Sequence, residues 1–171
     1  MIKAIIFDLG DTVIEQRHDH DQTLDELQLT LIGGARQALA TLSRSYKIGM
    51  ITNTSKSTAA NVIAALTALG IGKYIRVVVT SVDVGYKKPA NEIFENALRS
   101  LHVRSDESLM IGNDLIEDIH GAQAVGMHTG LFDPSGRFGR ACDADFTFSS
   151  MSTLPAMIAQ FESKKMIPRR Q

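Results

Sequence analysis

Hydrophobic residues along the chain gather in short uninterrupted runs. Five such runs occupy residues 2–7, 48–51, 75–79, 109–111 and 127–132, and a weaker sixth occupies residues 146–148. A short continuous apolar run is typical of a strand that is covered on both faces, as in a parallel sheet. The pattern therefore predicts five buried parallel strands and a weaker sixth.

Between these runs, apolar side chains recur at intervals of three and four residues, which is the spacing of one helix face. The stripes are Ala35, Ala38, Leu39 and Leu42; Ala59, Val62, Ile63, Leu66 and Leu69; Ile93, Phe94, Ala97, Leu98 and Leu101; Leu115, Ile119 and Ala122; and a last stripe within residues 154–161. Gly70 and Gly126 follow two of the stripes and are suited to end their helices. Strands alternating with helices predict an α/β fold with a doubly wound parallel sheet and right-handed crossovers.

One region, residues 14–32, breaks this alternation. Its polar half, residues 15–21, is expected to be exposed, and its Leu24, Leu27 and Leu31 are expected to form a short helix that covers a neighbouring part of the domain. The run His18-Asp19-His20-Asp21 contains metal-binding residue types, but in a polar loop we interpret it as a solvated surface segment.

Length and composition favour a single ordinary globular domain. The chain has 171 residues, of which 44% are hydrophobic and 22% charged. The formal net charge is −1 and no basic stripe runs through the body, so a nucleic acid is not an expected partner. Residues 164–171 form a basic tail that we expect to be solvated, which leaves residues 1–163 as the domain.

Cysteine content and hydropathy indicate in which cellular compartment the protein is expected. The single cysteine, Cys142, excludes an internal disulfide and a thiolate metal cluster. No histidine lies near it at a catalytic spacing, so we do not expect it to act as a nucleophile. No apolar stretch is long enough to span a bilayer, and the first run reaches Asp8 too soon to be a signal peptide. A cytoplasmic location without membrane contact is expected.

Residues with catalytic chemistry follow four of the predicted strands. They are Asp8-Leu9-Gly10-Asp11-Thr12 after the first strand, Thr52-Asn53-Thr54 after the second, Lys87-Lys88-Pro89 after the third, and Asn113-Asp114 with Asp118 after the fourth. Ligands of open α/β sheets bind beyond the carboxyl ends of the strands. We therefore expect the four clusters to share one edge of the sheet.

This set of side chains suits phosphoryl transfer. A carboxylate at the position of Asp8 can attack phosphorus and form an aspartyl-phosphate. Two anions approach only when their repulsion is cancelled, so a Mg²⁺ ion held by carboxylates such as Asp114 is required. Thr52 and Lys88 can then bind the phosphoryl oxygens, and Asp118, one helical turn beyond Asp114, can orient the waters of the metal.

Simpler interpretations exist for some of these residues. Asp114 precedes a predicted helix and can cap it, although capping does not exclude metal binding because both use the helix N-terminus. Lys87 is a rival to Lys88, but Lys88 stands directly before Pro89 and is favoured.

The four segments resemble, in order and spacing, the motifs of the haloacid dehalogenase superfamily, and Gly85-Tyr86-Lys87-Lys88-Pro89 resembles its phosphoglycolate-phosphatase-like branch. The resemblance covers nearly the whole chain apart from the tail. It implies a three-layer α/β/α Rossmannoid domain and a Mg²⁺-dependent phosphatase of phosphomonoesters. It also implies a catalytic group of Asp8, Asp11 and Lys88, a phosphate pocket of Leu9, Thr52, Asn53 and Lys88, and metal ligands among Asp8, the Gly10 carbonyl, Asn113, Asp114 and Asp118.

The sequence departs from the family pattern at Gly10. Phosphatases of the family usually have an aspartate there, which protonates the leaving group and then activates water. Such acid–base catalysis is worth roughly 100- to 10,000-fold. Asp11, the next residue, is the candidate to replace the missing acid–base group. Some phosphatases of the superfamily look similar here and have glycine at the same position, so loss of activity does not follow. The alternative is a catalytically weakened domain that binds phosphate and metal for regulation.

The segment 14–32 is too short for the helical cap on which haloacid dehalogenases and phosphonate hydrolases depend, so both activities rank below phosphatase. A two-component receiver is excluded by length and by motif order. A capless or minimally capped member exposes its site to water. The expected partner is therefore a phosphorylated macromolecule, or a phosphorylated small molecule if a second copy of the chain closes the site.

Overall fold

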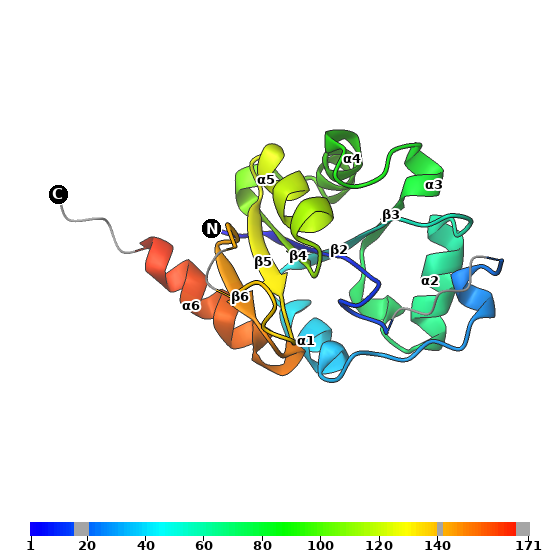
Figure 1. Ribbon diagram of the computed structural model, residues 1–171, viewed down its shortest axis with the longest axis horizontal. Coiled ribbons are helices and arrows are strands. Elements are labelled where there is room, and N and C mark those ends of the chain that lie inside the picture. The colour runs from blue at the N-terminus through cyan, green and yellow to red at the C-terminus, as the bar shows by residue number, and fades with distance from the viewer. Residues whose placement is uncertain (16–20, 140–141, 167–171) are drawn as a thin grey trace.

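The computed structural model describes residues 1–15, 21–139 and 142–166. A six-stranded sheet runs through its centre in the order β3-β2-β1-β4-β5-β6, and every neighbouring pair is parallel (Figure 1). The strands are β1 (Ala4–Phe7), β2 (Lys47–Thr52), β3 (Val77–Thr80), β4 (Ser108–Gly112), β5 (His128–Phe132) and β6 (Phe146–Phe148). All six predicted strands are present.

Helices cover both faces of the sheet. They are α1 (Ala35–Leu42), α2 (Ala59–Ala68), α3 (Ser81–Val84), α4 (Asn91–Leu101), α5 (Gly121–Ala124) and α6 (Leu154–Met166). Side chains of α1, α2 and α6 belong to one hydrophobic core, and those of α4 and α5 belong to a second. In Figure 1, α4 and α5 lie on one side of the sheet and α1 and α6 on the other. This arrangement confirms the predicted three-layer, doubly wound fold.

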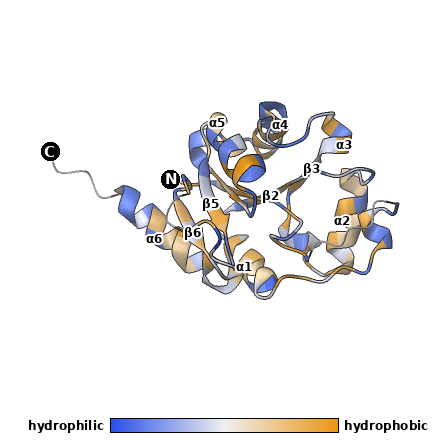
Figure 2. Ribbon diagram, in the orientation of Figure 1, coloured by the Kyte–Doolittle hydropathy of each residue, from blue (hydrophilic) through white to orange (hydrophobic). Residues whose placement is uncertain are grey.

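The central strand β1 shows why its sequence is continuously apolar. Ile5 and Phe7 point into the first core, whereas Ala4 and Ile6 point into the second. Successive side chains of a strand alternate between the two faces of its sheet, and here both faces are covered. Figure 2 shows hydrophobic residues concentrated on the strands and on the helix sides that face them.

The sheet order places a topological switch point beside β1. The chain moves from β1 to β2 and β3 on one side, and it reaches β4, β5 and β6 on the other. The connections therefore diverge between the carboxyl ends of β1 and β4, which leaves an opening there. Asp8 and Asn113 are the first residues after these two strands.

The predicted short helix in residues 14–32 is largely wrong. Among the described residues of this segment, the one helical element is a 3₁₀ turn, Leu24–Glu26, which begins with a capping box between Thr23 and Glu26 and ends where Leu27 becomes extended. Leu31 lies outside this turn and forms an antiparallel bridge to Ile14. His18, Asp19 and His20 lie outside the described residues.

The fourth predicted helix is divided. A π-helical segment, Leu115–His120, continues directly into α5. At the other end of the chain, α6 runs through Met166, so Lys164 and Lys165 of the predicted tail are helical, and Arg169 and Arg170 lie outside the described residues. Within residues 1–15, 21–139 and 142–166, none of the helices has the length and hydropathy needed to cross a bilayer.

Candidate active site

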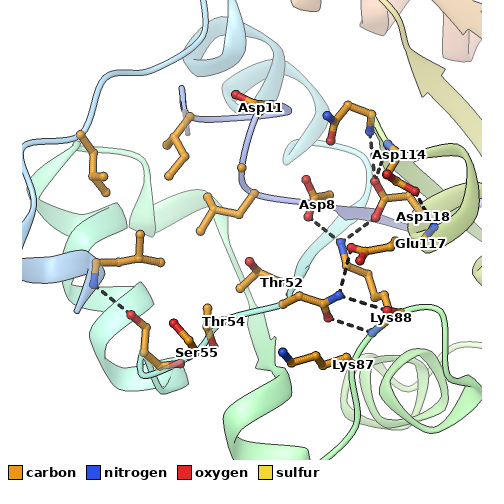
Figure 3. Close-up of a pocket in the computed structure, with 18 of the residues that line it drawn as sticks. Asp8, Asp11, Thr52, Thr54, Ser55, Lys87, Lys88, Asp114, Glu117 and Asp118 are labelled. Carbon is orange, nitrogen blue, oxygen red and sulfur yellow. Dashed lines mark hydrogen bonds and ion pairs between the residues drawn. The ribbon is translucent and has the colours of Figure 1, made fainter. Parts of the chain in front are cut away.

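The first residue after β1 is paired with a buried lysine. Lys88 Nζ lies 2.5 Å from Asp8 Oδ1 and 2.6 Å from Asp118 Oδ1, so one ammonium joins two carboxylates (Figure 3). All three side chains are buried, and Asp118 has no exposed surface. Of the two rival lysines, the structure places Lys88 beside the carboxylates and leaves Lys87 exposed.

Burial and charge act against each other in this cluster. Burial opposes the charged form of Lys88, but the charges of Asp8 and Asp118 outweigh it and raise the pKa of the ammonium. Burial also raises the pKa of Asp118, and the charge of Asp8 raises it further, against the opposing effect of Lys88. The ammonium is therefore held firmly protonated between the two carboxylates.

The second oxygen of Asp8 is held by Thr12. Thr12 Oγ1 donates to Asp8 Oδ2 over 3.0 Å, and it lies 3.1 Å from Asn113 Oδ1. Thr12 is fully buried in the turn that follows β1. Sequence reasoning placed Thr12 in the first motif but gave it no role, because its link to Asn113 joins residues that are distant in sequence.

Asn53 binds the main chain of Lys88. Lys88 N donates to Asn53 Oδ1 over 2.8 Å, and Asn53 Nδ2 donates to Lys88 O over 3.1 Å. Asn53 Nδ2 also donates to Glu117 Oε2 over 3.0 Å. The amide predicted to bind phosphate is thus occupied with positioning the lysine, and Glu117 is a further residue of the site that the sequence did not indicate.

Asp114 caps the π-helical segment, as its alternative interpretation proposed. Its Oδ1 accepts hydrogen bonds from Ile116 N (2.8 Å) and Glu117 N (2.7 Å). Asp118 Oδ2 accepts from Asn113 N and Asp114 N, each over 3.0 Å. Both oxygens of Asp118 are therefore engaged with protein groups, whereas Asp114 Oδ2 accepts a hydrogen bond from none of the described residues.

These residues open onto one cleft of about 510 Å³. Besides the cluster itself, it is lined by the predicted residues Leu9, Gly10, Asp11, Thr52, Asn113 and Asp114. Asp11 takes a left-handed backbone conformation with φ of 54°, and it lies apart from the cluster of Asp8, Lys88 and Asp118 in Figure 3. The structure thus brings all the predicted site residues to one cleft, with Asp11 toward its edge.

The donor set at the cleft fits a hard divalent cation. Asp8 and Asp114 offer carboxylate oxygens, Gly10 offers a carbonyl and Asn113 an amide oxygen, all on the lining. No group of three or more His, Cys, Asp or Glu side chains within the described residues is arranged to hold a metal by itself. A metal here would need main-chain and water oxygens in addition, which is the coordination that Mg²⁺ accepts.

Comparison with known proteins agrees with this geometry. The family model of haloacid dehalogenase-like hydrolases matches residues 6–132. A ribulose-1,5-bisphosphate 5-phosphatase of Halopiger xanaduensis is 38% identical over 109 residues, which are 63% of this chain and 44% of the relative. A pyrophosphatase of Bacillus cereus (PpaX) is 32% identical over 143 residues, which are 82% of this chain and 63% of the relative.

The chain spans less than two thirds of the length of both relatives. Among solved structures, a haloacid dehalogenase-type (HAD) phosphatase from Thermococcus onnurineus superposes with a TM-score of 0.78 at 21% identity, over 92% of this chain and 98% of the other. At this identity the likeness concerns the fold alone. The family model covers most of the chain, including the first, second, third and fourth strand ends, and the chain belongs to the haloacid dehalogenase-like hydrolase family.

Proposed function

We propose that this protein is a Mg²⁺-dependent phosphatase that hydrolyses a phosphomonoester through an aspartyl-phosphate on Asp8. The observation that carries the proposal is the buried ammonium of Lys88 between Asp8 and Asp118 at the base of the cleft. A fixed cation beside a carboxylate nucleophile stabilises the negative charge that gathers on a transferring phosphoryl group.

Asp8 acts first in this scheme. One carboxylate oxygen forms a bond to phosphorus while the bond from phosphorus to the leaving-group oxygen breaks. Thr12 Oγ1 holds Asp8 Oδ2, which fixes the orientation of the carboxylate. Thr52, the last residue of β2, lines the cleft and offers its hydroxyl to a phosphoryl oxygen, and Leu9 offers its main-chain N–H beside it, since its carbonyl accepts from the turn that follows.

The metal would be held by Asp8, Asp114 and the Gly10 carbonyl, with Asn113 beside them. When bound, Mg²⁺ neutralises the charges of the carboxylate and the phosphoryl group so that they can approach. In this proposal Asp118 is a positioning residue. One of its oxygens holds the ammonium of Lys88, and the other holds the main-chain N–H groups of Asn113 and Asp114.

Proton transfer is assigned to Asp11. Gly10 has no side chain to protonate the leaving oxygen or to activate the water that hydrolyses the aspartyl-phosphate. Asp11 is the next carboxylate along the loop and lines the same cleft. An Asp11→Asn variant should therefore lose roughly 100-fold or more in kcat, in the range of general acid–base catalysis.

The names of the relatives bear on the substrate class. Proteins named as a ribulose bisphosphate phosphatase and a pyrophosphatase share substantial sequence with this chain. We propose phosphorylated metabolites as the substrate class, with a second copy of the chain as the candidate cover of the open cleft.

The test is turnover of p-nitrophenyl phosphate by purified protein with and without Mg²⁺, alongside Asp8→Asn. Turnover should need Mg²⁺ and vanish in the variant. Equal rates for the two proteins would exclude the mechanism. Trapping of a phosphorylated protein that is lost in Asp8→Asn would report the intermediate directly.

A second candidate function follows from Gly10. A domain that keeps the phosphate and metal pocket but turns over negligibly would serve as a regulatory binding module. It predicts binding of Mg²⁺ and phosphate without hydrolysis, and a rise in rate when the acid–base group is introduced by Gly10→Asp. Clear activity of the wild-type protein would exclude it.

A further inference from the structure

Charge is distributed unevenly around the cleft. Its acidic lining residues, Asp8, Asp11, Asp114, Glu117 and Asp118, all follow β1 or β4. Its basic lining residues, Lys56, Lys87 and Lys88, all follow β2 or β3. The nucleophile and the proposed metal ligands lie on the acidic side, and the ammonium of Lys88 reaches them. Lys56 and Lys87 are therefore the basic residues left to face the part of the substrate beyond the scissile phosphoryl group.

The three lysines of the basic wall differ in what already neutralises them. Lys88 is buried between Asp8 and Asp118. Lys56 Nζ donates to the carbonyl of Asp21 over 3.1 Å and lies 3.9 Å from its carboxylate. Lys87 is exposed, and its side-chain ammonium forms no hydrogen bond or ion pair with any described residue, although its main-chain carbonyl accepts from Ala90 N. Its charge is thus available to a ligand.

Lys87 does not stand alone on this wall. Figure 3 shows its side chain with the nitrogen end directed toward the loop of Thr54 and Ser55, and not toward the cluster around Asp8. Ser55 lines the same cleft, and its hydroxyl has no partner in the described part of the chain. The neighbouring Thr54 hydroxyl donates to Ser57 O over 2.7 Å. Of these two hydroxyls, the one on Ser55 is therefore available to bind a ligand.

The opposite rim of this part of the cleft is fixed in place. Leu24 N donates to Ser57 Oγ over 2.9 Å, and Ser57 is buried. This bond ties the 3₁₀ turn Leu24–Glu26 to the loop that precedes α2. Leu24, Leu27 and Leu29 line the cleft from that side. These three lining residues are apolar, so none of them places a carboxylate in competition for the charge of Lys87.

We propose that Lys87 and Ser55 bind a second anionic group of the substrate, so that the protein prefers phosphomonoesters that carry a further phosphate or a carboxylate. The proposal rests on the proposed phosphatase function and specifies its substrate class. An ammonium and a hydroxyl together satisfy one anionic group by a charge-assisted and a neutral hydrogen bond.

The kinetic test uses substrates that share a three-carbon skeleton: glycerol phosphate, phosphoglycerate and glycerol bisphosphate. Wild-type kcat/KM should be about ten-fold higher for an anionic member than for glycerol phosphate, the scale of one hydrogen bond to a charged group. Preference for phosphoglycerate would identify a carboxylate as the second anion, and preference for glycerol bisphosphate a phosphate.

Variants assign this preference to residues. Lys87→Met should bring the ratio of kcat/KM values close to one, Lys87→Arg should retain it, and Ser55→Ala should reduce it less than Lys87→Met. The control is Lys73→Met, because Lys73 is exposed and absent from the cleft lining, and it should keep the wild-type ratio. A wild-type ratio of one, or an unchanged ratio in Lys87→Met, would overturn the proposal.

A binding measurement separates this proposal from the proposed function. Calorimetric titration of Asp8→Asn in Mg²⁺ should give a Kd about ten-fold lower for the preferred anionic compound than for glycerol phosphate, and Lys87→Met in the same background should remove the difference. If wild-type protein hydrolyses neither these compounds nor p-nitrophenyl phosphate but the difference in Kd persists, the phosphatase function fails and the anion site stands. Equal Kd values would eliminate the anion site alone.

Discussion

Asn53 binds Lys88 through both of its main-chain groups. The carboxamide oxygen accepts from Lys88 N over 2.8 Å, and the carboxamide nitrogen donates to Lys88 O over 3.1 Å. The Lys88–Pro89 peptide bond that follows is cis. A side chain from the end of β2 thus determines where the ammonium enters the cleft, so the second and third sequence motifs are coupled through a backbone contact.

We predict that Asn53→Ala lowers kcat by about 10- to 100-fold and raises KM by a smaller factor. The variant removes the two bonds that fix the Lys88 backbone, and a misplacement of about 1 Å in a catalytic group can cost that much. Steady-state kinetics with p-nitrophenyl phosphate would measure it. Asn91→Ala is the matched control, because Asn91 is exposed at the start of α4 and absent from the cleft lining. A similar loss in both variants would refute a positioning role for Asn53.

The sequence predicted the strand ends of the site well, for a simple physical reason. Parallel strands align their carboxyl ends, so Asp8, Thr52 and Asp114 could be assigned to one edge once the strands were recognised. The predicted motif residues do line one cleft. The bonds between them were not predictable in this way. Thr12 meets Asn113 and Asn53 meets Glu117 across sequence separations of 101 and 64 residues, and no local pattern encodes such contacts.

The error in residues 14–32 has a different origin. Leu24, Leu27 and Leu31 have helical spacing, and this predicted a helix. In the structure, Leu24 and Leu31 do pack against the first core, but from a 3₁₀ turn and an isolated bridge. Tertiary packing selected the same apolar residues and imposed a different backbone, which spacing alone cannot distinguish over so short a segment.

Removal of the Lys88 ammonium should destabilise the fold as well as stop turnover. Lys88→Met leaves Asp8 and Asp118 buried without their cation, and breaking a buried ion pair in this way costs about 3–5 kcal/mol. Urea denaturation in EDTA would measure the free energy of unfolding. Lys87→Met is the matched control and should change that free energy by less than about 0.5 kcal/mol, because Lys87 is exposed. Equal stability of the two variants would contradict this account of the cluster.

Gly112 is predicted to be indispensable at the end of β4. A Cβ added there would overlap the carboxyl group of Asp118, which packs directly over the glycine. Gly112→Ala should therefore displace Asp118 from Lys88, with a loss of about 1–3 kcal/mol in stability from overpacking and a large loss of kcat.

The matched control for Gly112→Ala is Gly33→Ala, since a Cβ at Gly33 meets nothing within 4 Å. Thermal unfolding and p-nitrophenyl phosphate turnover should show Gly33→Ala close to wild type. A Gly112→Ala protein with wild-type stability and kcat would show that Asp118 does not need its present position.

Tyr46 provides a pH prediction away from the active site. Its hydroxyl donates to Glu162 Oε2 over 2.6 Å, and Glu162 Oε1 accepts from Ile2 N over 2.9 Å, so α6 is tied to the starts of β1 and β2. Burial, the hydrogen bond to Glu162 and the charge of Glu162 raise the pKa of Tyr46 to about 12. Because the folded pKa lies above the ordinary value near 10, the stabilisation is complete below that value and is lost as the pH rises through about 12.

Phenolate absorbance can resolve this ionisation, because the chain has only 3 tyrosines and no tryptophan. In an alkaline titration of the folded protein, one tyrosine should ionise late, near pH 12. Tyr46→Phe should remove this late step, and Glu162→Gln should move it to lower pH because the carboxylate charge is gone. Tyr86→Phe is the control, since Tyr86 is exposed, and it should retain the late step. If the late step survives in Tyr46→Phe, the bond to Glu162 does not control the ionisation of Tyr46.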